Sequence, residues 1–478
     1  MDSATTDVKA IRQGLKGHGQ SHLLDFYDEL DPLRQKALLE QLAGIDFDRL
    51  DILIDRYVLN NPCAAMSEAI EPPEIVPAKP TDDDGVAEHA AARKRGDELI
   101  AAGKVAVFVV AGGQGTRLGY EGPKGCLEAT PVNHSPLFQV FAEQILAASR
   151  RTGARIPWYV MTSPTNDVAT RAFFRQHHNF NLPEEDVFFL TQGTMPAIDL
   201  GGKLLLADKG KLALSPDGHG GSLNALRRSG ALDDMASRGV ELISYFQVDN
   251  PLVRCVDPLF LGLHDLRKAE MSAKAISKRD PMEKLGNFCL LDGKVAIVEY
   301  SDLPEDLARA TNDDGRLKFC AGSIAIHVLS RAFVERLTDG SGPELPFHRA
   351  LKKVSHVDSD GRAITPSQPG AVKLEMFVFD ALPLAGQTVI LETDRSEEFS
   401  PIKNAAGADS INSSLHDQVR RAAAWLEEAG ITVPRDADGQ VAAAIEISPL
   451  YADSAEQFTQ KVDPNLTVMP GQNLYLSA

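Results

Sequence analysis

The chain has 478 residues, of which 43% are hydrophobic and 24% charged, and its formal net charge is −18. This length exceeds one ordinary domain core, so we expect two or three globular domains. The excess of negative charge argues against nonspecific nucleic-acid binding, which needs a basic surface. No apolar run reaches membrane-spanning length and the cysteines lack disulfide or zinc spacing, so we expect a cytoplasmic protein with no membrane partner.

Residues 1–70 have the pattern of short helices. Asp31 before Pro32 predicts a helix start, because an N-cap oxygen precedes proline at the first helical position. Gly44 predicts the end of this helix. The apolar positions predicted to share its buried face are Leu33, Ala37, Leu38 and Leu42. Residues 71–85 contain four prolines and an acidic run, which predict an extended connector.

Apolar runs alternate with helical segments from residue 105 to about 385. The runs typical of buried strands are 105–110, 158–161, 187–190, 242–247, 273–276 and 295–298. Helices are predicted at 139–150 and 168–177. This alternation predicts an α/β fold with a Rossmann-like, doubly wound sheet, mixed and mostly parallel. Ligands bind at the carboxyl ends of the strands in such sheets.

We therefore expect a helical N-terminal domain at residues 1–95 and an α/β domain at 96–385. Residues 386–478 mix a predicted helix at 415–429 with short strands such as 442–447. They are predicted to form a small C-terminal domain.

The most informative stretch follows the strand predicted at 105–110. It continues into Ala111, Gly112 and Gly113, and a third glycine follows at position 115. Glycines here let backbone N–H groups face a ligand, and a strand leading into such a turn is typical of phosphate sites. Arg117 and Lys124 would add two positive charges beside bound phosphates.

Two common phosphate motifs do not fit this stretch. The dinucleotide pattern begun at Gly113 would need glycine at position 118, which is Leu118, so a nicotinamide-dinucleotide enzyme is disfavoured. The P-loop is absent, because no Gly-Lys pair is followed by Ser or Thr. A plain glycine-rich turn is the remaining alternative, but it does not explain both cations.

The sequence GGQGTRLG, followed by PKG, resembles the uridylyltransferases that join UTP to a sugar 1-phosphate. It looks most like the UDP-N-acetylglucosamine pyrophosphorylases. The resemblance runs from about 105 to 410 and resumes at 446–450. It implies a nucleotidyltransferase fold of the GT-A-like kind and Mg²⁺ as cofactor. The implied substrates and products are UTP, a sugar 1-phosphate, a UDP-sugar and pyrophosphate, and we expect a monomer or a weak homo-oligomer.

Two segments are predicted to face the nucleotide. Gln192 follows the run at 187–190, and its amide can pair with the donor and acceptor edge of uracil. The resemblance implies that Gln192 contacts the base. Pro216 and Gly218 belong to a tight loop, rich in glycine, that contacts uridine and the sugar in the family. His219 in this loop stands where the family usually has asparagine, and it is predicted to bind the sugar.

Asp249 ends the apolar run at 243–247. A carboxylate at the carboxyl end of a strand suits Mg²⁺, which takes one or two carboxylates together with phosphate oxygens. The resemblance places the corresponding aspartate at the metal and the nucleotide. The alternative is that Asp249 caps the turn before Pro251.

Three further segments match the sugar side of the family, and they contain Gly286, Glu299 and Cys320. Cys320 replaces an asparagine that touches the sugar in the family, which puts the identity of the sugar in question. The alternative is that Cys320 is simply a small buried residue.

Two lysines lie within matched, largely apolar segments: Lys373 in KLEMFVFD and Lys403 in FSPIKN. The resemblance assigns both to substrate phosphates, with Lys373 at the nucleotide. Arg117, Lys124 and Lys403 are therefore the predicted catalytic residues.

Three readings of this pattern remain open. The first is uridylyl transfer from UTP to N-acetylglucosamine 1-phosphate. The second is the same reaction on glucose or galactose 1-phosphate, or on a broad set of sugars. The third is a nucleotide-sugar-binding protein without turnover, which would not need the full set of charged residues.

Overall fold

The computed structural model describes residues 8–60, 69–340 and 344–477. The chain divides into two compact units. The smaller unit consists of Met1–Met66, Gly193–Ser222 and Leu345–Val378, and the larger unit of Ser67–Gln192, Leu223–Glu344 and Phe379–Ala478. The smaller unit thus joins three segments that are distant in sequence. The three domain ranges predicted from the sequence stay a prediction.

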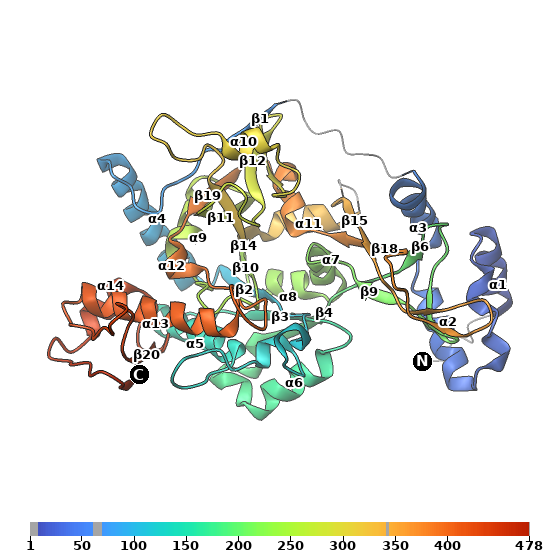
Figure 1. The fold of residues 1–478 in the computed structure, drawn as a ribbon, viewed down its shortest axis with the longest axis horizontal. Coiled ribbons are helices and arrows are strands. Elements are labelled where there is room, and N and C mark those ends of the chain that lie inside the picture. The colour runs from blue at the N-terminus through green and yellow to red at the C-terminus, as the bar shows by residue number, and fades with distance from the viewer. Residues whose placement is uncertain (1–7, 61–68, 341–343, 478) are drawn as a thin grey trace. The chain divides into compact units, whose positions relative to one another are not determined.

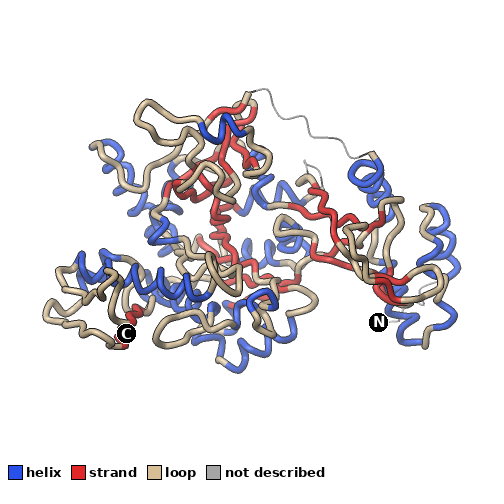
Figure 2. The backbone as a smooth tube through the Cα atoms, in the orientation of Figure 1, coloured by secondary structure: helices blue, strands red, loops and turns tan. Residues whose placement is uncertain are grey.

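A mixed sheet forms the centre of the larger unit (Figures 1 and 2). Its parallel part consists of β10 (Leu242–Gln247), β2 (Val105–Val110), β3 (Trp158–Thr162) and β4 (Val187–Thr191), in that order. Antiparallel pairing continues the sheet through β14 (Ala321–Ser330), β12 (Asn287–Leu291), β13 (Lys294–Val298) and β1 (Ile70–Glu71). β11 (Met271–Ser277) lies between β14 and β19 (Thr388–Glu392). The predicted α/β fold is confirmed.

Both faces of the parallel strands are covered. Val107 and Val109 of β2 belong to the hydrophobic core that includes residues of α4 (Asp83–Ala101), α5 (Leu137–Thr152) and α9 (Pro258–Leu266). On the opposite face Phe108 packs edge-on against Tyr245 of β10, with ring centroids 5.7 Å apart. On β3, Tyr159 donates a hydrogen bond to Asp234 of α8 (Ala231–Ser237). This burial on both faces explains why β2 is a continuous apolar run.

The predicted N-terminal helices are present as α1 (Val8–Gly17), α2 (Pro32–Ala43) and α3 (Phe47–Ile54). Asp31 caps α2 by accepting hydrogen bonds from the N–H groups of Leu33 and Arg34, each at 3.0 Å.

The predicted buried face of α2 was partly wrong. Leu33 is 81% exposed and Ala37 is also exposed, whereas Leu39 is buried together with Leu38 and Leu42. Positions 38, 39 and 42 form one stripe in a helix of about 3.6 residues per turn, whereas positions 33 and 37 project from the opposite side.

The predicted connector is shorter than 71–85, because α4 begins at Asp83, where Asp82 caps it by accepting from the N–H of Gly85. Among the described residues no helix is both long and apolar enough to cross a membrane. Cys126, Cys255, Cys289 and Cys320 carry free thiols, and Cys63 lies outside the described residues.

The C-terminal part of the larger unit has its own hydrophobic cluster, which includes Trp425 and Phe458. The predicted helix and strand are present as α13 (Ile411–Glu428) and β20 (Ala444–Ile447). β20 pairs in parallel with β21 (Asn473–Leu476).

The smaller unit contains a sheet of β15 (Phe347–Lys352), β18 (Ala371–Met376) and β6 (Ile198–Asp199). A second pair, β5 (Thr194–Pro196) and β9 (Leu214–Pro216), precedes the loop predicted to bind uridine.

Candidate functional site

The glycine-rich loop leaves the carboxyl end of β2 and folds back on itself. The N–H of Ala111 donates to the carbonyl of Met161 at 2.8 Å, which fixes the start of the loop to β3. Further on, the N–H of Gly115 donates to the carbonyl of Gly122 at 2.9 Å. The N–H of Lys124 then donates to the carbonyl of Gly113 at 3.1 Å. This return of the chain brings the predicted catalytic lysine to the first turn of the loop.

Gly112 and Gly113 differ in what surrounds them. A Cβ atom on Gly112 would lie 2.8 Å from Oε1 of Gln192, so the loop and the predicted base-binding glutamine are in contact. Gln192 is itself fixed by its N–H, which donates to the carbonyl of Thr162 at 2.8 Å. A Cβ atom on Gly113 would meet no atom within 4 Å. The open side of the loop is therefore at Gly113.

Gly113→Ala separates structure from ligand binding. We expect an unchanged melting temperature, because the added methyl group meets open space and the backbone φ is not positive. Phosphates bound against this loop would be crowded by the added methyl group, and such overpacking typically costs about 1–3 kcal/mol. We therefore expect kcat/KM for UTP to fall about tenfold or more. Gly370→Ala, equally open, is the control. Equal activity of Gly113→Ala and wild type would contradict phosphate binding here.

A charged cluster lies beside the loop. Nζ of Lys124 is 3.8 Å from Oδ2 of Asp249, and the two side chains are only 15% and 14% exposed. Burial lowers the pKa of Lys124 below its usual value, and the charge of Asp249 opposes this shift. The nearby positive charges of Lys403 and Arg117 lower the pKa of Lys124 further. The structure thus gathers the three predicted catalytic residues and the predicted metal ligand.

The cations of this cluster differ in exposure. Arg117 is exposed and forms no ion pair with any residue in the described parts of the chain. Lys403 is exposed as well, and its Nζ lies 5.8 Å from the ring centroid of Phe399. Both side chains can therefore reach a bound anion without first leaving a carboxylate.

The predicted sugar-binding residues of the larger unit also come together. The carbonyl of Gly286 accepts from the N–H of Ser323 at 2.8 Å, three positions after Cys320 on the same segment. A Cβ atom on Gly286 would lie 3.7 Å from Oε1 of Glu299. Cys320 is half-buried, and burial raises the pKa of its thiol above the usual value. Gly286, Glu299 and Cys320 therefore form one group where β12, β13 and β14 meet.

The smaller unit holds the other predicted residues. A Cβ atom on Gly218, whose φ is +84°, would lie 2.3 Å from the carbonyl oxygen of Met376. The N–H of Gly220 donates to the same oxygen at 2.8 Å. The loop that begins at Pro216 therefore packs backbone to backbone against β18, and only glycine fits at position 218. Lys373 lies on β18 itself, paired with Ala350 of β15.

His219 directly follows Gly218 in this loop. Its Nδ1 accepts a hydrogen bond from the N–H of Val378 at 3.1 Å, and its ring stacks on Phe377 with centroids 5.2 Å apart. His348 stacks on Phe377 as well. Burial, and secondarily the charge of His348, lowers the pKa of His219 to about 4, so its imidazole is neutral at pH 7. With Nδ1 accepting from Val378, the proton of the neutral ring is on Nε2, so the single acceptor of the imidazole is already used, whereas an asparagine amide can both donate and accept.

The sequence model of the family described as UTP–glucose-1-phosphate uridylyltransferase matches residues 53–430. The chain belongs to this family. UDP-N-acetylhexosamine pyrophosphorylase-like protein 1 of Xenopus tropicalis is 35% identical and covers 95% of both chains. UDP-N-acetylglucosamine pyrophosphorylase of Saccharomyces cerevisiae is also 35% identical, over 92% of this chain and 94% of the yeast protein.

A solved structure of uridine diphosphate N-acetylglucosamine pyrophosphorylase from Trypanosoma brucei superposes on this uridylyltransferase with a TM-score of 0.80 at 26% identity. The match covers 96% of this chain and 95% of the trypanosomal one. The predicted family and its nucleotidyltransferase fold are confirmed, whereas the roles of individual residues stay predictions.

Motif reasoning missed one residue that shapes the glycine loop of this uridylyltransferase. Oδ1 of Asn166 accepts from the N–H of Ser163 at 2.7 Å. Its Nδ2 donates to the carbonyls of Ala111 at 3.0 Å and Gly113 at 3.4 Å. Asn166 closes the turn after β3, and its position behind the apolar run at 158–161 was the only sequence signal.

Proposed function

We propose that this uridylyltransferase makes UDP-N-acetylglucosamine and pyrophosphate from UTP and N-acetylglucosamine 1-phosphate. The observation that supports it most strongly is the cluster of Arg117, Lys124, Asp249 and Lys403 beside an open glycine-rich loop. The relatives that are similar over more than nine-tenths of the chain have names that agree with this reaction.

The proposed chemistry is an in-line displacement at the α-phosphorus of UTP. A phosphate oxygen of the sugar 1-phosphate forms a bond to this phosphorus as the bond to the β-phosphate oxygen breaks, and pyrophosphate leaves with that electron pair. Such a reaction needs alignment and charge neutralisation rather than a covalent nucleophile from the protein. Amides of Gly112 and Gly113, with Arg117 and Lys124, would hold the triphosphate. Lys403 would hold the sugar phosphate.

Mg²⁺ is the proposed cofactor, with Asp249 as its ligand. Among the described residues no cluster of three or more His, Cys, Asp or Glu side chains could hold a metal ion by itself. A lone, partly buried carboxylate fits Mg²⁺, which commonly takes one or two carboxylates and fills its shell with phosphate oxygens and water. When bound, the ion would supply positive charge to the phosphates.

The remaining predicted residues have proposed roles in recognition. Gln192 would pair with uracil, and Pro216 and Gly218 would shape the uridine loop. Lys373 would serve the nucleotide phosphates. His219, Gly286, Glu299 and Cys320 each have a proposed role in sugar recognition. A cytoplasmic location and a monomeric or weakly associated state remain part of the proposal.

Cys320 favours a second candidate, a UTP–glucose-1-phosphate or broad UDP-sugar pyrophosphorylase. Cysteine is a weak hydrogen-bonding group, and a site that does not pair a substrate polar group discriminates less at that group. We expect measurable turnover of N-acetylgalactosamine or glucose 1-phosphate beside N-acetylglucosamine 1-phosphate. Cys320→Asn should sharpen the preference for one sugar about tenfold, the scale of one net hydrogen bond. Unchanged kcat/KM ratios in the variant would mean that Cys320 does not face the sugar.

The experiment that tests the function is pyrophosphate release from UTP with a panel of sugar 1-phosphates, with MgCl₂ and with EDTA. We expect the highest kcat/KM for N-acetylglucosamine 1-phosphate and no release in EDTA. A higher value for glucose 1-phosphate would favour the second candidate. UDP-sugar binding without release for any sugar would favour a non-catalytic binding protein.

A further inference from the structure

The segment that carries Lys403 is anchored by charges buried in the larger unit. Lys274 of β11 is fully buried, and its Nζ donates to Oδ2 of Asp257 and to both carboxylate oxygens of Glu398, each at 2.6 Å. Glu398 also accepts from the hydroxyl of Thr393 at 2.5 Å and from the N–H of Arg254 at 3.2 Å. Its carboxylate is therefore held from three separate parts of the chain.

Asn250 links this anchor to the charged cluster. Its Nδ2 donates to the carbonyl of Glu398 at 2.6 Å, and its Oδ1 accepts from the N–H of Ser400 at 3.1 Å. One step further, the N–H of Ile402 donates to the carbonyl of Asp249 at 2.8 Å. Residues 398–402 thus run beside the end of β10. These hydrogen bonds fix the backbone position from which the side chain of Lys403 extends.

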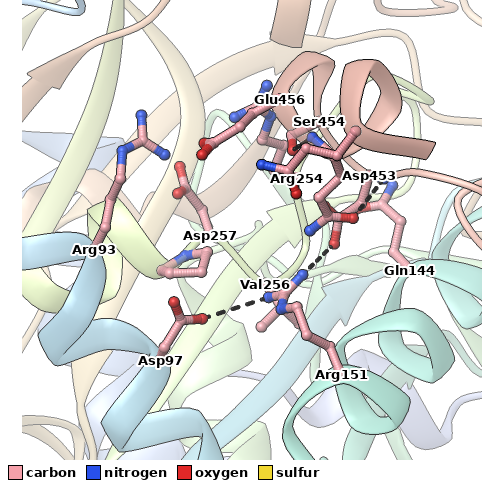
Figure 3. Close-up of a pocket in the computed structure, with 13 residues that line it drawn as sticks. Arg93, Asp97, Gln144, Arg151, Arg254, Val256, Asp257, Asp453, Ser454 and Glu456 are labelled. Atoms are coloured by element: carbon pink, nitrogen blue, oxygen red, sulfur yellow. Dashed lines mark hydrogen bonds and ion pairs between the residues drawn. The ribbon is translucent and has the colours of Figure 1, made fainter. Parts of the chain in front are cut away.

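Asp257 and Arg254 form the outer side of the anchor, where they line a polar pocket together with Arg93 (Figure 3). Asp257 also caps α9 by accepting from the N–H of Leu259 at 3.0 Å. Burial opposes ionisation of Asp257, but the charges of Lys274 and Arg254 outweigh it and hold its pKa below the usual value. Asp257 therefore stays ionised at neutral pH.

A buried ion network of this kind is weak evidence for stability, because desolvation offsets much of the attraction between the charges. The importance of this network lies in its geometry, because its hydrogen bonds fix the path of the backbone at residues 398–402. We propose that Lys274, Glu398 and Asn250 are positioning residues that hold Lys403 in register with Asp249 and Lys124 for uridylyl transfer. They act through Lys403, and the inference rests on the proposed function.

The test is a double-mutant cycle on kcat. Asn250→Ala is expected to lower kcat by about a hundredfold, the cost of misplacing a reacting group by about 1 Å, with little change in the KM for UTP. Lys403→Ala should cost about as much. In the double variant the losses should not multiply, because Asn250 has no further effect once Lys403 is gone. Multiplying losses would overturn the proposal.

Lys274→Met combined with Glu398→Gln and Asp257→Asn provides a second route, since it removes the three charges that meet at Lys274 with little change in volume. The same non-multiplying loss with Lys403→Ala is expected, and it can be measured if Asn250→Ala does not fold. The control is Asp186→Asn, because Asp186 is 4% exposed and pairs with Arg155 and Arg238 elsewhere in the larger unit. Its effect on kcat should be small, and it should simply multiply with that of Lys403→Ala.

The experiments distinguish a failure of the proposed function from a failure of the positioning role. If wild type releases no pyrophosphate with any sugar 1-phosphate, the proposed function is wrong. If wild type is active and the losses multiply, only the positioning role is wrong.

Discussion

Lys124→Ala is expected to lower kcat by about a hundredfold, because a cation lost from a transition state typically costs about 3 kcal/mol or more. Lys124 is the least exposed cation of the cluster, 15% exposed, and the glycine-rich loop fixes its backbone. The charge on the triphosphate grows at the leaving pyrophosphate, so the loss should appear in kcat. UDP-sugar carries fewer phosphates, and its binding should weaken much less.

The measurement pairs steady-state kinetics with calorimetric binding of UDP-N-acetylglucosamine. Lys94→Ala, which removes one positive charge from an exposed position on α4, is the control and should leave both quantities unchanged. A kcat of Lys124→Ala within a few-fold of wild type would mean that Lys124 does not contact the phosphates.

Asp249→Asn is expected to abolish most activity, by roughly a thousandfold, because loss of the proposed Mg²⁺ would remove several kcal/mol of charge stabilisation. The substitution keeps the shape of the side chain and the carbonyl that accepts from Ile402. The melting temperature should therefore change little, and excess MgCl₂ should restore little activity.

The structure also bears on the alternative that Asp249 caps the turn before Pro251. In that turn it is Oδ1 of Asn250 that accepts from the N–H of Leu252, at 3.2 Å. A variant that stays active, or one that loses activity only by unfolding, would return Asp249 to a structural role. Thermal unfolding and activity measured on the same samples separate these outcomes.

The sequence predicted best the elements whose local pattern decides their structure. β2 and β10 have the predicted bounds, since continuous apolar runs buried on both faces are unambiguous when glycine or polar residues end them. The glycine-rich loop was found for the same reason. Leu33 shows the limit of such patterns, because it was grouped with Leu38 and Leu42 although it lies on the opposite side of α2, where it remains exposed.

The pairing of strands that are distant in sequence could not be predicted from local sequence patterns. The smaller unit joins three distant segments through strands such as β18 and β6, and no local signal announces that pairing. Lys124 and Asp249 were predicted singly, and they meet because β2 and β10 are parallel neighbours. Lys274 was hidden within an apolar run, since its partners Asp257 and Glu398 come from other parts of the chain.

The most direct test of the central proposal follows the two ends of the triphosphate. The enzyme is incubated with MgCl₂, N-acetylglucosamine 1-phosphate and UTP labelled with ³²P at either the α- or the γ-phosphate. We expect α-label to appear in UDP-N-acetylglucosamine and γ-label in pyrophosphate, in equal amounts and at equal rates. Label that stays in UTP although UDP-sugar binds, or γ-label transferred to the sugar phosphate, would contradict it.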